Sequence, residues 1–416
     1  MSLKILSWSS LQTVIKNSLY IFAGRASNAL FLFLLTLVVS RQLGPALYGI
    51  YSFLIAVIVS ANCFSNLGLD IWMVREVTKI PSRGKQYLAN ILGIKIGASL
   101  ITIALVFLIF KTTNLPQSTL NLLWIASISI LFNSISQTLW HYGNCFKLFI
   151  YHSILWASSN IIKAGLGIIL VLLYQELEPL IWGIVVAEVL AMMLSFYVIL
   201  RRFGSFVPEF KFMVWKDFLV RSTPIALGMI FSVLYFRLDI VMLQLLTEET
   251  VVGIYSAAYK LFEVAVVLPH SVMLVLFPTL VDEFHSNLTQ FRKRFKKALV
   301  AYSFFGLGIA LVLSGFSHEI VGIIYGDKFL PSADVLEILS WAIFLFFVNF
   351  LLSNALIASG REISNTWNLF GAMVLNIILN LVWIPRYGSM GAAWSTFACE
   401  VGLIILLYFQ TRKSVT

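Results

Sequence analysis

Hydrophobic residues form long runs along the chain, and polar residues gather between the runs. Window after window holds 18 or more residues with almost no charge, enough for an α-helix to cross the apolar bilayer core of about 30 Å. Strands of a membrane barrel would instead alternate apolar and polar residues over about ten positions. The pattern predicts twelve spanning helices at roughly 17–39, 47–68, 87–110, 119–141, 150–174, 179–200, 218–246, 251–281, 298–317, 334–358, 363–384 and 389–410.

The composition supports this prediction. Hydrophobic residues make up 60% of the chain and charged residues 12%, which leaves too little polar surface for a soluble domain. No short apolar segment with a small-residue cleavage site precedes the first span, so we expect that span to stay in the protein. The three cysteines have neither pairing nor metal spacing. The sequence therefore predicts an all-α polytopic membrane protein without a resident metal or other cofactor.

Basic residues are distributed unequally between the two sides of the predicted bundle. With the N-terminus inside, 19 Lys and Arg residues lie on its side and 4 on the opposite side. This bias places both termini in the cytoplasm, with the protein in the cytoplasmic (inner) membrane. It also accounts for most of the net charge of +10, so no nucleic-acid partner is needed. The basic stretch FRKRFKK at 291–297 suits acidic membrane lipids.

Enzyme classes find little support in the sequence. The predicted external loops are short, whereas a membrane glycosyltransferase, polymerase or ligase needs a folded domain or a long loop for its catalytic site. No helical zinc motif, nucleotide-binding glycine loop or nucleophile elbow occurs. We therefore expect a protein that is not an enzyme.

The two halves of the chain resemble each other. GIYS occurs at 49–52 and again at 253–256, 204 positions apart in 416 residues. The stretches 187–202 and 399–413 each run from an acidic residue, through an apolar run, to a pair of basic residues. These matches predict a duplication, with an N-terminal six-helix lobe at 1–206 and a C-terminal six-helix lobe at 207–416. Pseudo-symmetric lobes of this kind are typical of transporters, which bind their substrate in a central cavity and expose it alternately to each side.

Ten charged residues fall inside the predicted spans, where each costs at least about 2.5–3.5 kcal/mol if it faces lipid. Lys95 and Arg221 lie near enough to a helix end to snorkel to the surface, although Arg221 stays a candidate ligand. Because basic residues outnumber acidic ones, we expect the cavity to bind an anion. The candidate substrate ligands are Arg25, Lys163, Arg221, Arg237 and Lys260, and the candidate ion-coupling carboxylates are Glu188, Asp239, Glu263 and Glu400.

The spacing of these residues adds detail. Lys260 and Glu263 are three apart, on one helix face, and can form a pair. Arg237 and Asp239 are two apart and point to different sides. Tyrosines and a phenylalanine near the charges are candidates for stacking on sugar rings: Tyr51, Tyr235, Phe236, Tyr255 and Tyr259.

Several stretches resemble a known family. RQLGPALYGIYSF (41–53) and LGLDIWMVRE (67–76) are similar to the first two helices of polysaccharide-biosynthesis flippases of the O-antigen type. YFRLDIVMLQLL (235–246) and VGIYSAAYKLFE (252–263) resemble helices seven and eight of the same proteins. YGDKFLPSADVLEIL (325–339) and LNIILNLVWIPRYGSMGAAWSTFACE (375–400) resemble their last third.

The resemblance implies a flippase of the superfamily that includes lipid II flippases and multidrug and toxin extruders, with a MATE-like fold. Its substrate would be an undecaprenyl-diphosphate-linked oligosaccharide, moved by alternating access for surface polysaccharide synthesis. Membrane lipids, a polysaccharide polymerase and glycosyltransferases would be its other partners. The protein would act as a monomer, with H⁺ or Na⁺ as a coupling ion. Arg25 matches a basic position of the first helix that the resemblance associates with lipid-diphosphate transport, and Arg237 and Asp239 match a basic-x-acidic pattern common in helix seven of these proteins.

Two other functions stay open at this point. A cation-coupled multidrug antiporter would share the fold, although a net positive cavity disfavours cationic drugs. A non-transporting subunit of a polysaccharide assembly complex would use the buried charges only to pack its lobes.

Overall fold

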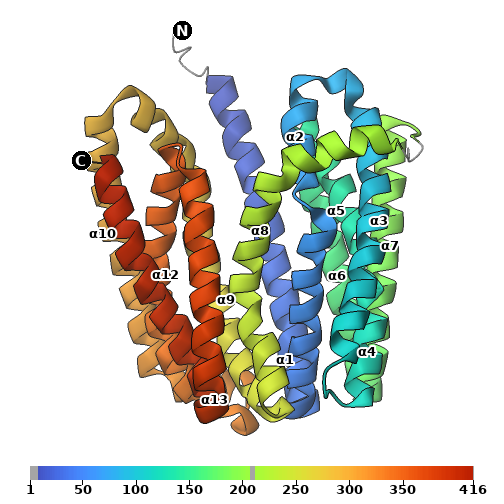
Figure 1. Cartoon of the computed structure of the whole chain (residues 1–416), viewed down its shortest axis with the longest axis vertical. Helices are drawn as coiled ribbons and strands as arrows, with labels where there is room; N and C mark the ends of the chain where they lie inside the picture. Colours follow the sequence, from blue (N-terminus) through green and yellow to red (C-terminus); the bar gives the residue numbers. More distant parts are fainter. Residues whose placement is uncertain (1–7, 207–210, 416) are drawn as a thin grey trace. The chain divides into compact units, whose positions relative to one another are not determined.

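The computed structural model describes residues 8–206 and 211–415, with side chains for Gly24, Ser27, 29–206 and 211–411. These residues form α-helices and two short 3₁₀ helices, and no strand occurs among them. The helices are α1 (Trp8–Asn66), α2 (Leu69–Lys79), α3 (Gly84–Lys111), α4 (Gln117–Ser127), α5 (Ser129–Cys145), α6 (Phe149–Tyr174), α7 (Leu177–Phe203), α8 (Phe212–Leu246), α9 (Glu249–Ser286), α10 (Leu288–Gly315), α11 (Ser317–Tyr325), α12 (Ser332–Ala358) and α13 (Glu362–Val415) (Figure 1).

Ten helical segments of the described chain are long and apolar enough to cross a membrane. Two of them, Ala29–Lys79 and Glu362–Thr411, have 51 and 50 residues, about twice the length that one crossing needs. The helix in each bends at a glycine, Gly44 with φ 74° and Gly388 with φ 55°, because these backbone angles suit a residue without Cβ. The helices α1 and α13 thus each cover two of the predicted spans nearly completely, and the all-α membrane fold is confirmed.

The chain packs as two compact units. Unit 1 contains Ala61–Thr112, Leu120–Ala226 and α1 up to Thr36. Unit 2 contains Leu37–Ser60, Thr113–Thr119 and the chain from Leu227 onward. The units are defined by packing alone, so the lobe boundary between residues 206 and 207 stays a prediction from the repeat.

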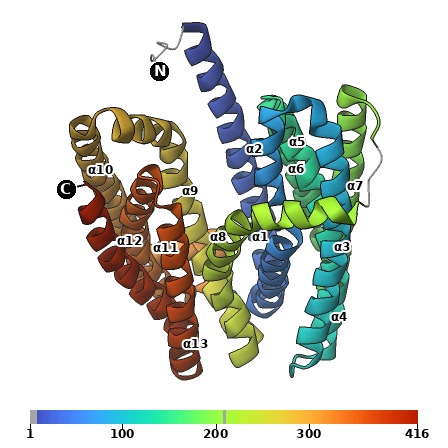
Figure 2. The same ribbon diagram turned by 45° about the horizontal axis from the view of Figure 1, so that its top comes forward.

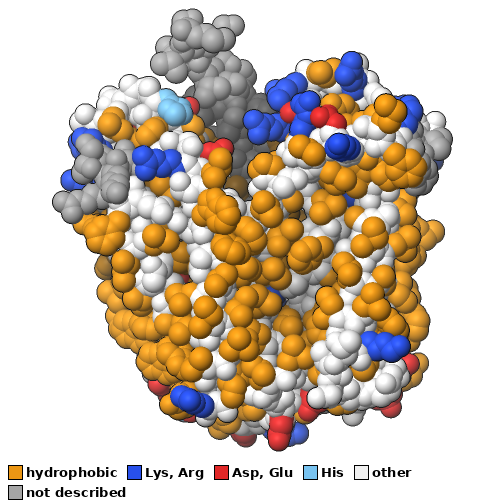
Figure 3. All heavy atoms as spheres, in the orientation of Figure 1, with side chains coloured by type: hydrophobic (Ala, Val, Ile, Leu, Met, Phe, Trp, Pro, Cys, Tyr) orange, Lys and Arg blue, Asp and Glu red, His pale blue; other side chains and the backbone are white. Residues whose placement is uncertain are grey.

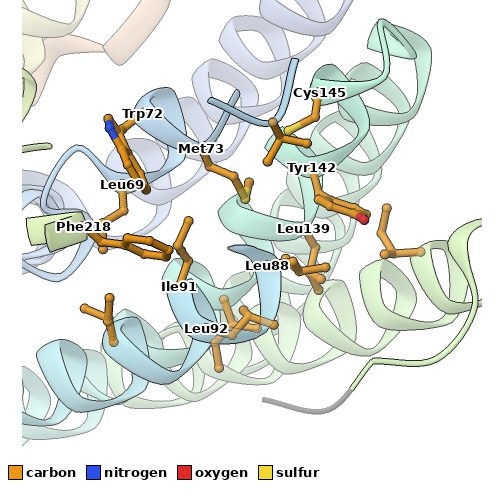
Figure 4. Close-up of a cluster of buried hydrophobic side chains, with 14 residues drawn as sticks. Leu69, Trp72, Met73, Leu88, Ile91, Leu92, Leu139, Tyr142, Cys145 and Phe218 are labelled. Atoms are coloured by element: carbon orange, nitrogen blue, oxygen red, sulfur yellow. The ribbon is translucent and has the colours of Figure 1, made fainter. Parts of the chain in front are cut away.

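Unit 1 has a hydrophobic core at one end of its helices, shown in Figure 4. The short helix α2 buries Leu69, Trp72 and Met73 against α3, α5 and the start of α8. Phe218 of α8 packs its ring 4.7 Å from that of Trp72 and so fixes the first turns of α8 on this core. The first part of α8 is therefore held by unit 1.

Unit 2 is built around α12, which packs against α9, α10, α11 and α13. Figures 1 and 2 show α10, α12 and α13 side by side. Apolar residues occupy most positions of α12, and those between Leu336 and Leu356 are mostly buried. A helix that is apolar on all sides is stable only when neighbours surround it, which is the position α12 holds.

The two GIYS copies contact each other inside unit 2. A Cβ built on Gly49 would lie 2.0 Å from the carbonyl oxygen of Glu249, four residues before Gly253. A Cβ on Gly253 would lie 2.0 Å from the carbonyl oxygen of Pro45, four residues before Gly49. Each copy therefore meets the same position of the other, a reciprocity that marks a local two-fold relation. The two GIYS copies therefore lie where α1 and α9 cross, and the two backbones are too close there for any residue larger than glycine.

The surface agrees with a membrane setting. On the face seen in Figure 3, hydrophobic side chains cover most of the length of the helices in each unit, and charged side chains gather toward the helix ends. Exposed apolar residues such as Leu105, Leu173 and Phe304 would be unfavourable in water and suit a lipid environment. The chain is therefore a multi-pass membrane protein.

Candidate functional site

Unit 1 holds a fully buried ion pair between α2 and α3. Lys95 Nζ lies 2.7 Å from Asp70 Oδ2 and also donates to Thr138 Oγ1 at 2.8 Å. Thr138 Oγ1 in turn donates to Asp70 Oδ1 at 2.8 Å. Lys95 has 0% and Asp70 1% of its side chain exposed. The prediction that Lys95 snorkels is wrong, because Asp70, which the sequence analysis placed outside the spans, compensates its charge inside the unit.

A second ion pair joins α6 and α7. Lys163 Nζ lies 2.5 Å from Glu188 Oε1, and Asn133 Nδ2 of α5 donates to both Glu188 oxygens at 3.1 and 3.2 Å. Gln137 Nε2 donates to Asn133 Oδ1 at 2.6 Å, and its Oε1 accepts from Asn66 at 3.2 Å.

Asn66 connects the two ion pairs of unit 1. Its Nδ2 also lies 2.7 Å from Asp70 Oδ2, so hydrogen bonds run without a break from Asp70 to Glu188. The charges along this path cancel, with Lys95 opposite Asp70 and Lys163 opposite Glu188. Among the described residues of unit 1, Lys95 and Lys163 are therefore each neutralised by a carboxylate of the same unit.

Unit 2 holds a cluster with an excess of positive charge. Arg237 of α8 and Lys260 of α9 both contact the carboxylate of Glu263, with Lys260 Nζ 2.9 Å from Glu263 Oε2. The pairing of Lys260 with Glu263 that their spacing suggested is present. All three side chains are 22–23% exposed, in contrast to the buried pair of unit 1. Two cations share one anion, which leaves a partly accessible positive charge that a further anion can bind.

Asp239 points away from Arg237, as the spacing of two predicts, and is buried among neutral donors. Tyr255 OH and Thr396 Oγ1 each donate to Asp239 Oδ2 at 2.8 Å, and Asn380 Nδ2 donates to Oδ1 at 2.6 Å. No ion pair joins Asp239 to a basic side chain in the described part of the chain. The side-chain oxygen of Asn380 is buried and has no hydrogen-bond partner among the described residues. This carboxylate has the surroundings of a site for a proton or a small cation.

Glu400 is a second buried carboxylate of unit 2 with neutral partners. It accepts from Tyr235 OH at 2.8 Å and from Asn349 Nδ2 at 2.7 Å. The repeat relates it to Glu188, which pairs with Lys163. The two related carboxylates thus differ, because one has a lysine and an amide as partners and the other a phenol and an amide.

The remaining predicted residues lie elsewhere. Arg221 is on the exposed first part of α8, where its Nε lies 2.8 Å from Asp217 Oδ1, one turn earlier. Arg25 is in α1, but its side chain lies outside the described residues. Tyr51, Tyr255 and Tyr259 are buried, and the hydroxyl of Tyr259 donates to the backbone oxygen of Phe236, so these rings pack within unit 2 in this structure.

Sequence reasoning missed the uncharged ligands of these carboxylates. Asn133 and Gln137, like Asn376 and Asn380, are amide pairs four residues apart in apolar helices. Such a pair lies on one helix face, and its burial in lipid or protein is costly unless both amides are bonded. That spacing is the signal by which the sequence could have revealed them.

Comparison with solved structures places the fold. The lipid II flippase MurJ in an inward closed conformation matches with a TM-score of 0.76 and 16% identity, covering 96% of this chain and 87% of that one. An inward-facing multidrug resistance transporter of the MATE family matches with a TM-score of 0.68 and 14% identity, covering 92% and 94%. The MATE-like fold predicted from the sequence is therefore confirmed.

Comparison with protein sequences gives the family. CapF, a capsular polysaccharide biosynthesis protein of Staphylococcus aureus, is 23% identical over 412 residues, which are 96% of this chain and all of that protein. Agl15 of Haloferax volcanii, a probable low-salt glycan biosynthesis flippase, is 26% identical over 169 residues, 39% of this chain and 34% of that protein. The sequence profile of the MatE family matches residues 224–382. The profile of the family described as "Polysaccharide biosynthesis protein" matches residues 14–284, more than half of the chain, and the chain belongs to this family.

Proposed function

We propose that this protein flips a polyprenyl-diphosphate-linked oligosaccharide, with undecaprenyl as the carrier, from the cytoplasmic to the outer leaflet of the cytoplasmic membrane. The excess positive charge of the Arg237–Glu263–Lys260 cluster carries this proposal. The diphosphate of such a substrate carries at least two negative charges. A guanidinium can donate two parallel hydrogen bonds to its oxygens. Membership of a polysaccharide biosynthesis family supports the oligosaccharide as the transported group.

The exposure of the cluster favours binding over a purely structural role. Lys95 and Asp70 show what a structural ion pair looks like in this protein, since both are fully buried and equal in charge. Arg237, Lys260 and Glu263 are instead partly open and unequal in charge. A bound diphosphate would replace Glu263 as the partner of one of the two cations. Lys163, Arg25 and Arg221 stay candidate ligands from the sequence; Lys163 is paired with Glu188 and Arg221 with Asp217 in this structure.

The carboxylates of unit 2 are the proposed coupling groups. A buried carboxylate without a cationic partner is costly, so it favours a proton or a bound cation. Oxygen donors suit Na⁺, and Asp239, Asn380 and Thr396 supply a carboxylate, an amide and a hydroxyl, of which the amide oxygen has no other partner. These three residues would hold Na⁺, which when bound would neutralise Asp239. Glu400, Glu188 and Glu263 are the other coupling candidates, but the last two already have cationic partners.

Transport would follow alternating access with both termini in the cytoplasm, the orientation that the 19 to 4 distribution of basic residues favours. The polyprenyl chain would stay in lipid while its head group crosses. Such a transport step requires two kinds of partner. Glycosyltransferases assemble the oligosaccharide repeat unit, and a polymerase extends it.

Reconstitution into proteoliposomes tests the proposal. A fluorescently labelled polyprenyl-diphosphate oligosaccharide is incorporated, and its transfer between leaflets is measured by its protection from an impermeant quencher. We expect Arg237→Ala and Lys260→Ala to slow transfer about 10- to 100-fold, the value of a charge-assisted hydrogen bond of about 1.5–3 kcal/mol. Arg361→Ala, an exposed basic residue between α12 and α13, is the matched control and should transport normally.

Two results would overturn the proposal. Transfer at the wild-type rate in both cluster variants would show that the diphosphate does not use these cations. Transport of a fluorescent cationic drug, with no transfer of the lipid-linked sugar by the wild-type protein, would assign the multidrug antiporter function instead.

A further inference from the structure

We propose that unit 2 carries a binding site for the ammonium head group of a phosphatidylethanolamine lipid, in a groove between α10, α12 and α13. The groove has a volume of about 230 Å³ and is lined by Ser314, Glu337, Ile338, Trp341, Trp394 and Phe397. All six residues belong to unit 2 and lie outside the charged clusters described above. The lipid site does not depend on which substrate the protein transports.

Glu337 is an unusual residue for its position. It lies five residues after the start of α12, about 7–8 Å along a helix that is apolar and otherwise largely buried. Its side chain is exposed, and no described basic side chain forms an ion pair with it. The hydroxyl of Ser317 is its one described side-chain partner, at a long 3.4 Å. An exposed carboxylate in a membrane-spanning helix with no basic side chain beside it favours a cationic ligand.

Two tryptophans border this carboxylate. Trp341 follows Glu337 by four residues and so lies on the same face of α12, and Trp394 comes from the neighbouring α13. Their side chains are 40% and 48% exposed, and Phe397 packs edge-to-face on Trp394 with ring centroids 5.7 Å apart. Indole faces attract cations, and Trp is the strongest of the aromatic residues in this respect. Carboxylate and indoles together form a site for an organic cation.

The charge around the groove favours the same ligand. Asp334 lies three residues before Glu337 on α12, and its carboxylate has only the imidazole of His318 as an ionic neighbour, at 3.8 Å. The groove is at the end of α10 that lies opposite the basic stretch 291–297. Asp334 and Glu337 thus place two carboxylates on one stretch of α12 beside the groove, and no described lysine or arginine forms an ion pair with either.

The chemistry of the groove selects a primary amine on a lipid. The helices that line the groove are long and apolar enough to span a membrane, and Leu311, Val312 and Trp394 on them are exposed. A lipid of the bilayer could therefore reach the groove while its acyl chains stay in the membrane. A primary ammonium donates hydrogen bonds to a carboxylate and a hydroxyl, such as those of Glu337 and Ser314. The trimethylammonium of phosphatidylcholine donates none, and phosphatidylglycerol has no cation. We therefore expect a preference for phosphatidylethanolamine.

Native mass spectrometry of the purified full-length protein tests this site. The protein is titrated with phosphatidylethanolamine, phosphatidylcholine or phosphatidylglycerol of the same chain length. The wild type should bind phosphatidylethanolamine more tightly than the other two lipids. Glu337→Gln should weaken this binding about tenfold or more and leave phosphatidylglycerol unchanged. Trp394→Leu should weaken it about two- to fivefold, the value of an exposed cation–π contact.

Glu319→Gln is the matched control, because it removes an exposed carboxylate from α11 outside the groove and should leave the preference intact. Melting temperatures of all variants establish that they fold. Equal binding of the three lipids by the wild type would overturn the proposal, as would an unchanged preference in folded Glu337→Gln. Displacement of the lipid by millimolar free ethanolamine would also overturn it, since the site would then select a soluble amine.

Discussion

The contact between the two GIYS copies makes a sharp prediction about stability. In Gly49→Ala the new Cβ would lie 2.0 Å from the carbonyl oxygen of Glu249, and in Gly253→Ala 2.0 Å from that of Pro45. Contacts of a real Cβ essentially never fall under 3.0 Å, so the two helices must separate by about an ångström or more at their crossing. Forcing extra volume into a packed contact costs about 1–3 kcal/mol. Each single variant should therefore unfold at a lower temperature than the wild type.

Gly308→Ala is the matched control in α10 of the same unit, because a Cβ there meets nothing within 4 Å. It should be neutral or slightly stabilising, since alanine favours the helix by about 0.8–1 kcal/mol over glycine. Melting is followed by tryptophan fluorescence in detergent. Since both clashes act on one crossing, the double variant should lose less than the sum of the single losses. Melting of Gly49→Ala and Gly253→Ala at or above the temperature of Gly308→Ala would refute the reasoning.

The polar clusters give three further predictions. Lys95→Met should lower stability by about 3–5 kcal/mol, because it leaves Asp70 charged and buried, and adding Asp70→Asn should restore most of the loss in a chemical denaturation series. Lys163→Met should cost less than Lys95→Met in the same series, since Lys163 is 17% exposed and water can partly replace it; an equal cost would contradict the difference in burial. Asp239→Asn should leave the melting temperature unchanged or raised, yet remove the response of transport to an imposed Na⁺ or pH gradient; a response that persists would exclude Asp239 as the coupling group.

The spans were the most predictable part of the fold. Uncharged runs of about twenty residues specify a membrane helix by solvation alone, without knowledge of the neighbours. The bends at Gly44 and Gly388 were less accessible, because a single residue with non-helical backbone angles makes each of them and no loop separates the two helical parts.

The partners of the buried charges were predictable only where they lie on one helix. Lys260 and Glu263 share a face three residues apart, and the structure pairs them. Lys95 and Asp70 are 25 residues apart, so only the packing of α2 on α3 brings them together. The neutral donors around Asp239 come from α9 and from both parts of α13, before and after Gly388, and no spacing rule relates such positions.

The GIYS repeat was visible in the sequence, but its packing role was visible only in the structure. Its recurrence at half the chain length indicated a duplication, and the reason for its glycines appears only in the reciprocal contact of Gly49 with the α9 backbone. A sequence pattern thus located the crossing, but the close approach of two backbones is a property of packing.

The central claim is that the excess charge of the Arg237–Glu263–Lys260 cluster recognises a diphosphate. Its most direct test compares one oligosaccharide carried on polyprenyl diphosphate and on polyprenyl monophosphate, in the same proteoliposomes. We predict that the wild-type protein transfers the diphosphate form faster, and that Arg237→Ala and Lys260→Ala lose most of this discrimination. Equal rates for the two carriers in the wild-type protein would contradict the account.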